Sequence, residues 1–90
     1  MTYRVEYTRT AVRQIRKMDR QIAAFILTFI EDRLVGCEDP RLYGKPLQGN
    51  LGDKWRYRVG DYRILAKIQD ESVVITVVEV GHRKKIYEMK

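Results

Sequence analysis

The amino-acid sequence predicts an α+β fold in the order β-α-α-β-β-β, with a helical hairpin packed on a small, mostly antiparallel twisted sheet and a short basic C-terminal tail. Three patterns predict this class. Apolar and charged residues alternate near the N-terminus, apolar residues recur at spacings of three and four in residues 11–34, and alternation returns in residues 55–80. Ninety residues fit one domain, so we expect residues 1–90 to fold as a single unit.

The first strand and the two helices follow from local signals. Tyr3–Tyr7 alternates apolar and charged residues, as a half-buried strand does. Thr8 or Thr10 then supplies the side-chain oxygen that caps a helix N-terminus. Asp19 has the same role for a second helix, which Gly36 is expected to end. Because the connection between the helices is very short, we expect them to be antiparallel.

Residues 37–53 are predicted to form a loop, because Pro and Gly interrupt them and no apolar period survives. Strand patterns return at Trp55–Val59 and Tyr62–Ile68. Between these strands lies Gly60-Asp61, a two-residue turn with glycine first, which favours a tight hairpin.

The last predicted strand is Val73–Val80, a nearly unbroken β-branched run that is typical of a strand covered on both faces. The turn Asp70–Ser72 connects it to the strand before it. Residues 81–88 form the short basic tail.

Composition narrows the function classes. Eighteen Lys and Arg against twelve Asp and Glu give a net charge of +6, which indicates a polyanionic partner such as nucleic acid, or else only a soluble basic surface. No apolar run is long enough to span a membrane. Cys37 is the only cysteine, which fits a reducing cytoplasm and leaves no internal disulfide. We expect a cytoplasmic chain with no metal and no cofactor, because no pair of Cys or His has ligand spacing.

The predicted hairpin places cations side by side. With a two-residue loop, Arg58 faces Arg63 across the ladder, and Arg56 lies one step along the same face. Lys54 and Lys67 extend this face. Like charges directly opposite each other destabilise a hairpin, so this arrangement does not favour stability. Guanidinium groups bind phosphate bidentately, and the pattern therefore favours a phosphate-binding face. Neutralisation by acidic neighbours or by solvent is the alternative.

The tail carries further candidates. Arg83 reaches the same face if the last strand lies beside the hairpin. Tyr87 has a ring that can stack on a base, but it is also consistent with an ordinary tail residue that packs on the sheet. His82 is the only histidine and a candidate for proton transfer, but it points away from Arg83 if the chain is extended there. Lys84 is a further candidate for substrate binding.

Residues 45–47, 55–64 and 80–87 resemble the RelE branch of the RelE/ParE toxins, above all in Gly-Asp-Tyr-Arg at 60–63 and in Gly-His-Arg at 81–83 followed by Tyr87. The resemblance covers nearly the whole chain. It implies a cytoplasmic toxin of a bacterial or archaeal type II toxin–antitoxin system, held inert by a RelB-like antitoxin, with a toxin–antitoxin heterotetramer as one assembly. It also implies ribosome-dependent cleavage of mRNA in the A site by attack of a ribose 2′-hydroxyl on the adjacent phosphate, which inhibits translation.

The resemblance and the hairpin together give one set of site residues. The expected catalytic residues are Arg56, Arg58, Arg63, Arg83 and Tyr87, and the expected substrate-binding residues are Lys54, Lys67 and Lys84.

One departure concerns the mechanism. Well-known members have lysines where this chain has Arg56 and Arg58, and arginine is a poor proton acceptor because its pKa exceeds about 12. A lysine-base mechanism therefore does not transfer. Proton transfer falls to Tyr87, to His82 or to the ribosome, or else the arginines act only electrostatically.

Two other functions stay open at this point. A ParE-like toxin shares the fold but inhibits DNA gyrase without nuclease activity, and a non-catalytic RNA-binding module needs only the basic face. The combination of Arg83 with Tyr87 favours the nuclease branch.

Overall fold

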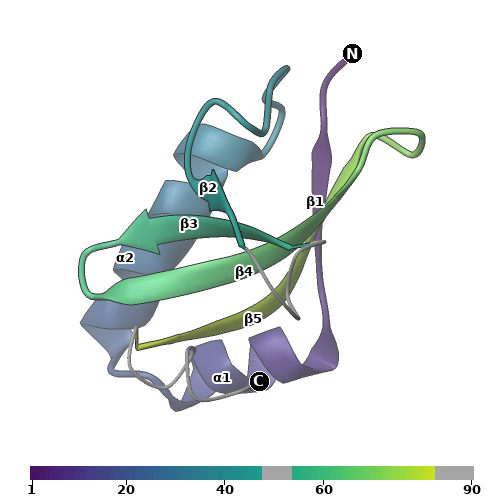
Figure 1. Cartoon of the computed structure of the whole chain (residues 1–90). Coiled ribbons are helices and arrows are strands. Elements are labelled where there is room, and N and C mark those ends of the chain that lie inside the picture. The colour runs from purple at the N-terminus through teal and green to yellow at the C-terminus, as the bar shows by residue number, and fades with distance from the viewer. Residues whose placement is uncertain (48–53, 83–90) are drawn as a thin grey trace.

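One mixed sheet forms the framework of the computed structural model, which describes residues 1–47 and 54–82 (Figure 1). Its strand order is β1-β5-β4-β3-β2, with β1 parallel to β5 and the other neighbours antiparallel. The expected α+β class is confirmed. Along the chain the elements are β1 (Arg4–Tyr7), α1 (Arg9–Lys17), α2 (Arg20–Phe29), the π-helical turn η1 (Ile30–Leu34), β2 (Lys45–Pro46), β3 (Trp55–Val59), β4 (Tyr62–Gln69) and β5 (Val74–His82).

Both predicted helix caps are present. The Thr8 hydroxyl accepts a hydrogen bond from the Ala11 amide at 3.1 Å, and the Asp19 carboxylate accepts one from the Gln21 amide at 3.0 Å. The second helix continues through η1, and Gly36 follows it with a φ of +77°. The two helices follow each other across the short connection Met18-Asp19, and both contribute side chains to the core.

The hydrophobic core lies between the helices and one face of the sheet, the helix face. Ile26 and Ile30 from the second helical segment pack with Tyr57, Ile64 and other apolar residues of the strands, and all four are fully buried. Burial of these side chains supplies the main driving force for folding. The opposite face of the sheet, the outer face, is therefore the one available to carry charge. None of the described helices is long and apolar enough to cross a bilayer.

Several element boundaries differ from the sequence-based expectation. The expected loop 37–53 contains the two-residue strand β2, in which Lys45 pairs with Arg56 of β3. Val73 lies outside the last strand, because its φ of +56° closes the turn that begins at Asp70. The last strand instead extends to His82, which belongs to β5 rather than to the tail.

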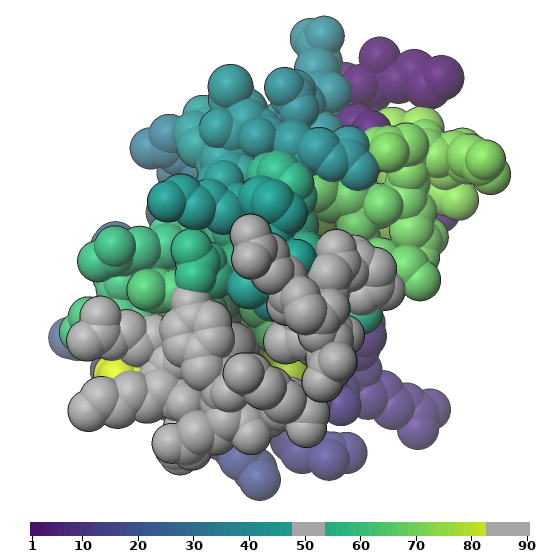
Figure 2. All heavy atoms as spheres, viewed as in Figure 1, coloured from purple at the N-terminus to yellow at the C-terminus, as the bar shows by residue number. Residues whose placement is uncertain are grey.

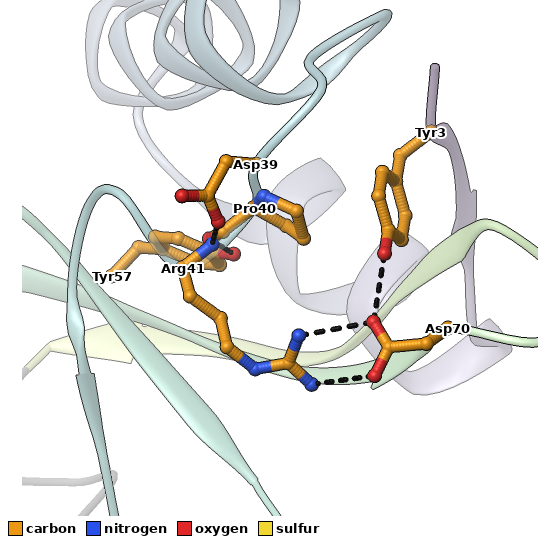
Figure 3. Close-up of polar contacts among 6 residues, drawn as sticks. All are labelled: Tyr3, Asp39, Pro40, Arg41, Tyr57 and Asp70. Carbon is orange, nitrogen blue, oxygen red and sulfur yellow. Dashed lines mark hydrogen bonds and ion pairs between the residues drawn. The ribbon is translucent and has the colours of Figure 1, made fainter. Parts of the chain in front are cut away.

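Side chains of the sheet hold the segment that leads into β2 (Figure 3). The buried Tyr57 hydroxyl donates to the Pro40 carbonyl at 2.6 Å. Arg41 donates to both carboxylate oxygens of Asp70 at 3.0 Å, and the Tyr3 hydroxyl donates to the same carboxylate at 2.7 Å. These bonds fix the segment against the sheet edge although it has almost no regular structure.

Gly44 completes this attachment. Its φ is +80°, and a Cβ added there would overlap the carbonyl oxygen of Arg56 and crowd the indole nitrogen of Trp55. The indole nitrogen itself donates to the carbonyl of Tyr43 at 2.6 Å. Only glycine allows the backbone to come this close to β3.

We expect Gly44→Ala to lower the free energy of unfolding much more than Gly36→Ala. Both positions have positive φ, which costs an L-residue about 1–2 kcal/mol, but a Cβ at Gly36 meets nothing within 4 Å. Urea unfolding of the two variants measures the difference. Equal losses would contradict the close approach of Gly44 to β3.

We expect Asp70→Asn to reduce the loss of stability in acid. Hydrogen bonds from Arg41 and Tyr3 lower the pKa of Asp70, so its folded pKa lies below its unfolded value of about 3.9. Its contribution is therefore present above pH 4 or so and is lost as pH falls through the folded pKa. Thermal melts of the unaltered chain and of Asp70→Asn, each at pH 7 and in acid, measure the loss of stability. Parallel losses in the two proteins would exclude this contribution of Asp70.

Candidate functional site

The β3–β4 hairpin has the register that the sequence predicts. Val59 pairs with Tyr62 and Arg58 with Arg63, across a turn in which Gly60 has a φ of +60°. Because directly opposed residues share one side of a sheet, Arg58 and Arg63 lie together on the outer face.

The two arginines converge on one atom. The Arg58 Nε and an Arg63 terminal nitrogen each lie 3.4 Å from the Gly60 carbonyl oxygen. Arg58 is exposed, whereas Arg63 is only 6% exposed, and its buried Nε has no hydrogen-bond partner. Among the described residues, this buried cation is held beside another cation by contacts with the carbonyl oxygens of Gly60 and Tyr62.

No acidic residue of the described chain forms an ion pair with these arginines. The two ion pairs among residues 1–47 and 54–82 are Arg4–Glu6 and Arg41–Asp70. A buried charge without a partner is costly, and the cost is offset when an anion binds. The sequence left neutralisation by acidic neighbours open, and no acidic residue within 1–47 and 54–82 forms an ion pair with Arg58 or Arg63.

A hollow of about 440 Å³ lies beside the two arginines. Figure 2 shows the teal segment that contains β2 bordering the green hairpin. The lining residues are four cations and four neutral residues, namely Lys45, Arg56, Arg58, Arg63, Phe29, Leu42, Tyr43 and Gly44. Pockets of several hundred Å³ hold small ligands, so this hollow has room for part of a nucleotide beside its cations.

Lys45 is a site residue that sequence reasoning missed. It lies directly opposite Arg56, which gives the sheet a second pair of opposed like charges besides Arg58 and Arg63. Its position depends on the pairing of β2, a strand too short to show an apolar period. The only signal in the sequence is the Lys-Pro dipeptide itself.

The expected lysines extend the outer face. Lys54 directly precedes β3, two residues before Arg56, and Lys67 is exposed on β4 opposite Thr76. We name the set Lys45, Lys54, Arg56, Arg58, Arg63 and Lys67 the cationic face.

An acidic residue also lies on this face and was missed. Glu79 pairs with Leu65, because a register shift leaves Val78 as an extra residue in β5. Burial raises the pKa of Glu79, while the charge of Lys54 lowers it.

His82 lies on the opposite face from the arginines. It pairs with Tyr62, whose ring it meets edge to face at a centroid distance of 5.5 Å. A separate hollow of about 430 Å³ surrounds His82 together with Gln14, Lys17 and other residues of the helix face. The structure therefore does not bring His82 together with the cationic face.

The remaining expected site residues, Arg83, Lys84 and Tyr87, lie outside the described residues. Among the residues described, no group of three or more His, Cys, Asp and Glu is placed to hold a metal ion.

Comparison with known proteins gives consistent matches. Residues 5–87 match the family model of the ParE toxin of the type II toxin–antitoxin system parDE. Toxin RelG of Mycobacterium tuberculosis is 36% identical over 87 residues, covering 97% of this chain and 98% of the relative.

Solved structures agree with this match. The toxin–antitoxin complex RelBE2 from Mycobacterium tuberculosis contains a chain with a TM-score of 0.83 and 34% identity, covering 92% of this chain and 93% of that one. The archaeal RelE–RelB complex from Pyrococcus horikoshii gives a TM-score of 0.71 at 27% identity, covering 92% of this chain and 97% of that one.

We expect Arg58→Ala to leave the free energy of unfolding unchanged or to raise it by up to about 0.5 kcal/mol, because it removes one of two directly opposed like charges. Arg41→Ala is the matched control: it removes an exposed arginine that binds a carboxylate, so it should lower stability. Chemical unfolding of both variants tests this. A clear loss in Arg58→Ala would mean that Arg58 stabilises the fold.

Proposed function

The chain belongs to the RelE/ParE superfamily of type II toxin–antitoxin toxins, and we propose that it is a ribosome-dependent endoribonuclease that cleaves mRNA in the A site and so inhibits translation. The observation that carries the proposal is Arg63, a buried cation that lies opposite Arg58 and forms no ion pair with the described residues. Its surroundings are suited to an anion, and a phosphodiester in a single RNA strand is an anion of the required kind.

The cationic face stabilises negative charge in this mechanism. When the ribose 2′-hydroxyl attacks the adjacent phosphate, charge accumulates on the phosphate oxygens. Arg58 and Arg63 are preorganised at the hairpin turn to bind these oxygens, and Arg56 and Lys45 line the same hollow. Electrostatic stabilisation of this sort contributes most when water is excluded, which fits the burial of Arg63.

Neighbouring aromatic residues supply contacts to a base. Phe29 and Tyr43 line the hollow beside the cations, and aromatic rings stack on the unpaired bases of single-stranded RNA. The proposal also includes Arg83 and Tyr87 as catalytic residues and Lys84 as a phosphate contact, on the basis of the sequence resemblance.

A RelB-like antitoxin is the proposed protein partner. The similar chains of Mycobacterium tuberculosis and Pyrococcus horikoshii were solved in complexes with their antitoxins. An acidic segment that folds on binding would complement the net charge of +6 and cover the cationic face.

A second function has a specific observation in its favour. The matching family model describes ParE, and a ParE-like toxin acts on DNA gyrase rather than on mRNA. The two functions differ in what they require of the cationic face, since only the nuclease needs it for a chemical step.

We expect primer extension on a defined message in a purified translation system to show codon-phased cuts that require ribosomes. Arg63→Ala should reduce cleavage by roughly 10²-fold or more, as does loss of other charge-stabilising groups. Arg13→Ala, an exposed arginine on α1, is the control and should cleave normally.

Two other results would contradict the nuclease, and a third would contradict the role of Arg63. Intact message together with inhibited gyrase supercoiling would favour the ParE-like function. RNA binding that weakens steeply with salt, without cleavage, would favour a non-catalytic module. Normal cleavage by Arg63→Ala would show that Arg63 is not part of the catalytic site.

A further inference from the structure

The strand pairings define the position of Glu79 on the outer face, where residues paired across neighbouring strands form a row. The pairings align Arg56, Leu65 and Glu79 across three strands, and the neighbouring row on the same face is Arg58, Arg63 and Gly81. Glu79 is thus one row from Arg63 and lies on the same side of the sheet. Gly81 is the β5 residue that pairs with Arg63. Because it has no side chain, it contributes no group next to Arg63 on this face.

A β-bulge puts Glu79 on this face. Ile75 and Val77 belong to the core, so strict alternation would also direct residue 79 toward the helices. The extra residue Val78 reverses the alternation, and the Thr8 hydroxyl donates to the Val78 carbonyl at 2.7 Å. Bulges are enriched next to active sites, where they redirect a side chain. The carboxylate is therefore placed among cations by a specific feature of the backbone.

Charged groups from the neighbouring strands share the outer face with Glu79. They are Lys54 directly before β3, Arg56 of β3, Arg63 and Lys67 of β4, and, on β1, Glu6 with its ion-pair partner Arg4. Lys54 is the charge that acts on Glu79 directly. No ion pair among the described residues includes Glu79.

We propose that Glu79 is the general base that accepts the proton of the attacking ribose 2′-hydroxyl, an inference that rests on the proposed nuclease function. The reaction needs a proton acceptor near the phosphate-binding cations. Arg56 and Arg58 are too basic to serve, and His82 lies on the helix face. Glu6, a second carboxylate among the described residues of the outer face, is already paired with Arg4 at the sheet edge.

A carboxylate oxygen of Glu79 takes the 2′-hydroxyl proton while the 2′-oxygen forms a bond to phosphorus. The bond from phosphorus to the 5′-oxygen of the next nucleotide breaks with its electron pair, and this oxygen takes a proton from water. The products are a 2′,3′-cyclic phosphate and a 5′-hydroxyl end, and Glu79 later returns its proton to solvent.

Partial burial suits Glu79 to this role. It raises the pKa of the carboxyl toward neutrality, and a base works best when its pKa lies near the working pH. Since only the ionised form accepts a proton, the cleavage rate should fall as acid protonates Glu79.

The test compares single-turnover cleavage rates against pH on programmed ribosomes saturated with toxin. Glu79→Gln keeps the shape of the side chain and should slow cleavage by roughly 10²–10⁴-fold and remove the acidic limb of its pH profile. Glu71→Gln, an exposed glutamate in the β4–β5 turn, is the matched control and should behave as the unaltered chain. Thermal melting shows that each variant is folded.

A second variant excludes a merely structural role. Added formate should restore part of the cleavage by Glu79→Ala, because a small carboxylate then occupies the vacated position, and it should not affect Arg63→Ala. Cleavage by folded Glu79→Gln within about twofold of the unaltered chain, with the same pH profile, would overturn the general base while leaving the nuclease intact. Absence of cleavage by the unaltered chain would overturn the proposed function, and the base with it.

Discussion

The two-residue turn at Gly60-Asp61 is the constraint on which the outer face depends. It fixes the register of β3 against β4, so that Arg58 and Arg63 oppose each other and Tyr57 and Ile64 enter the core. A slip of one residue would exchange the two faces and place guanidinium groups against the helices. The same register that fills the core therefore assembles the cations, and burial of the apolar side chains maintains the repulsive pair.

A second attachment completes the hollow beside that hairpin. Segment 39–47 is held by the Tyr57–Pro40 hydrogen bond and by the close approach of Gly44 to β3. It brings Lys45 opposite Arg56 and adds the aromatic ring of Tyr43 to the lining of the hollow. The directly opposed Arg58–Arg63 pair opposes stability, and it is understandable as part of a surface that binds a polyanion.

Local sequence patterns predicted most of the fold. The caps at Thr8 and Asp19 and the tight hairpin each depend on a few neighbouring residues. They can therefore be predicted from the sequence without knowledge of tertiary contacts. β2 and Lys45 were missed because their positions depend on contacts with β3, and Glu79 was missed because a one-residue bulge inverts the alternation. Charge pattern indicated a phosphate-binding face, but the reaction came from the family resemblance and not from the spacing of residues.

The central claim is that the cationic face is present for binding and chemistry and not for stability. Replacing Arg63 with methionine, which has a similar volume and no charge, tests it when the free energy of unfolding and the cleavage rate are measured on one preparation. The account predicts unchanged or increased stability, because a buried and incompletely bonded charge is removed, together with loss of cleavage. Reduced stability with cleavage retained would show that Arg63 is a structural residue and would contradict the account.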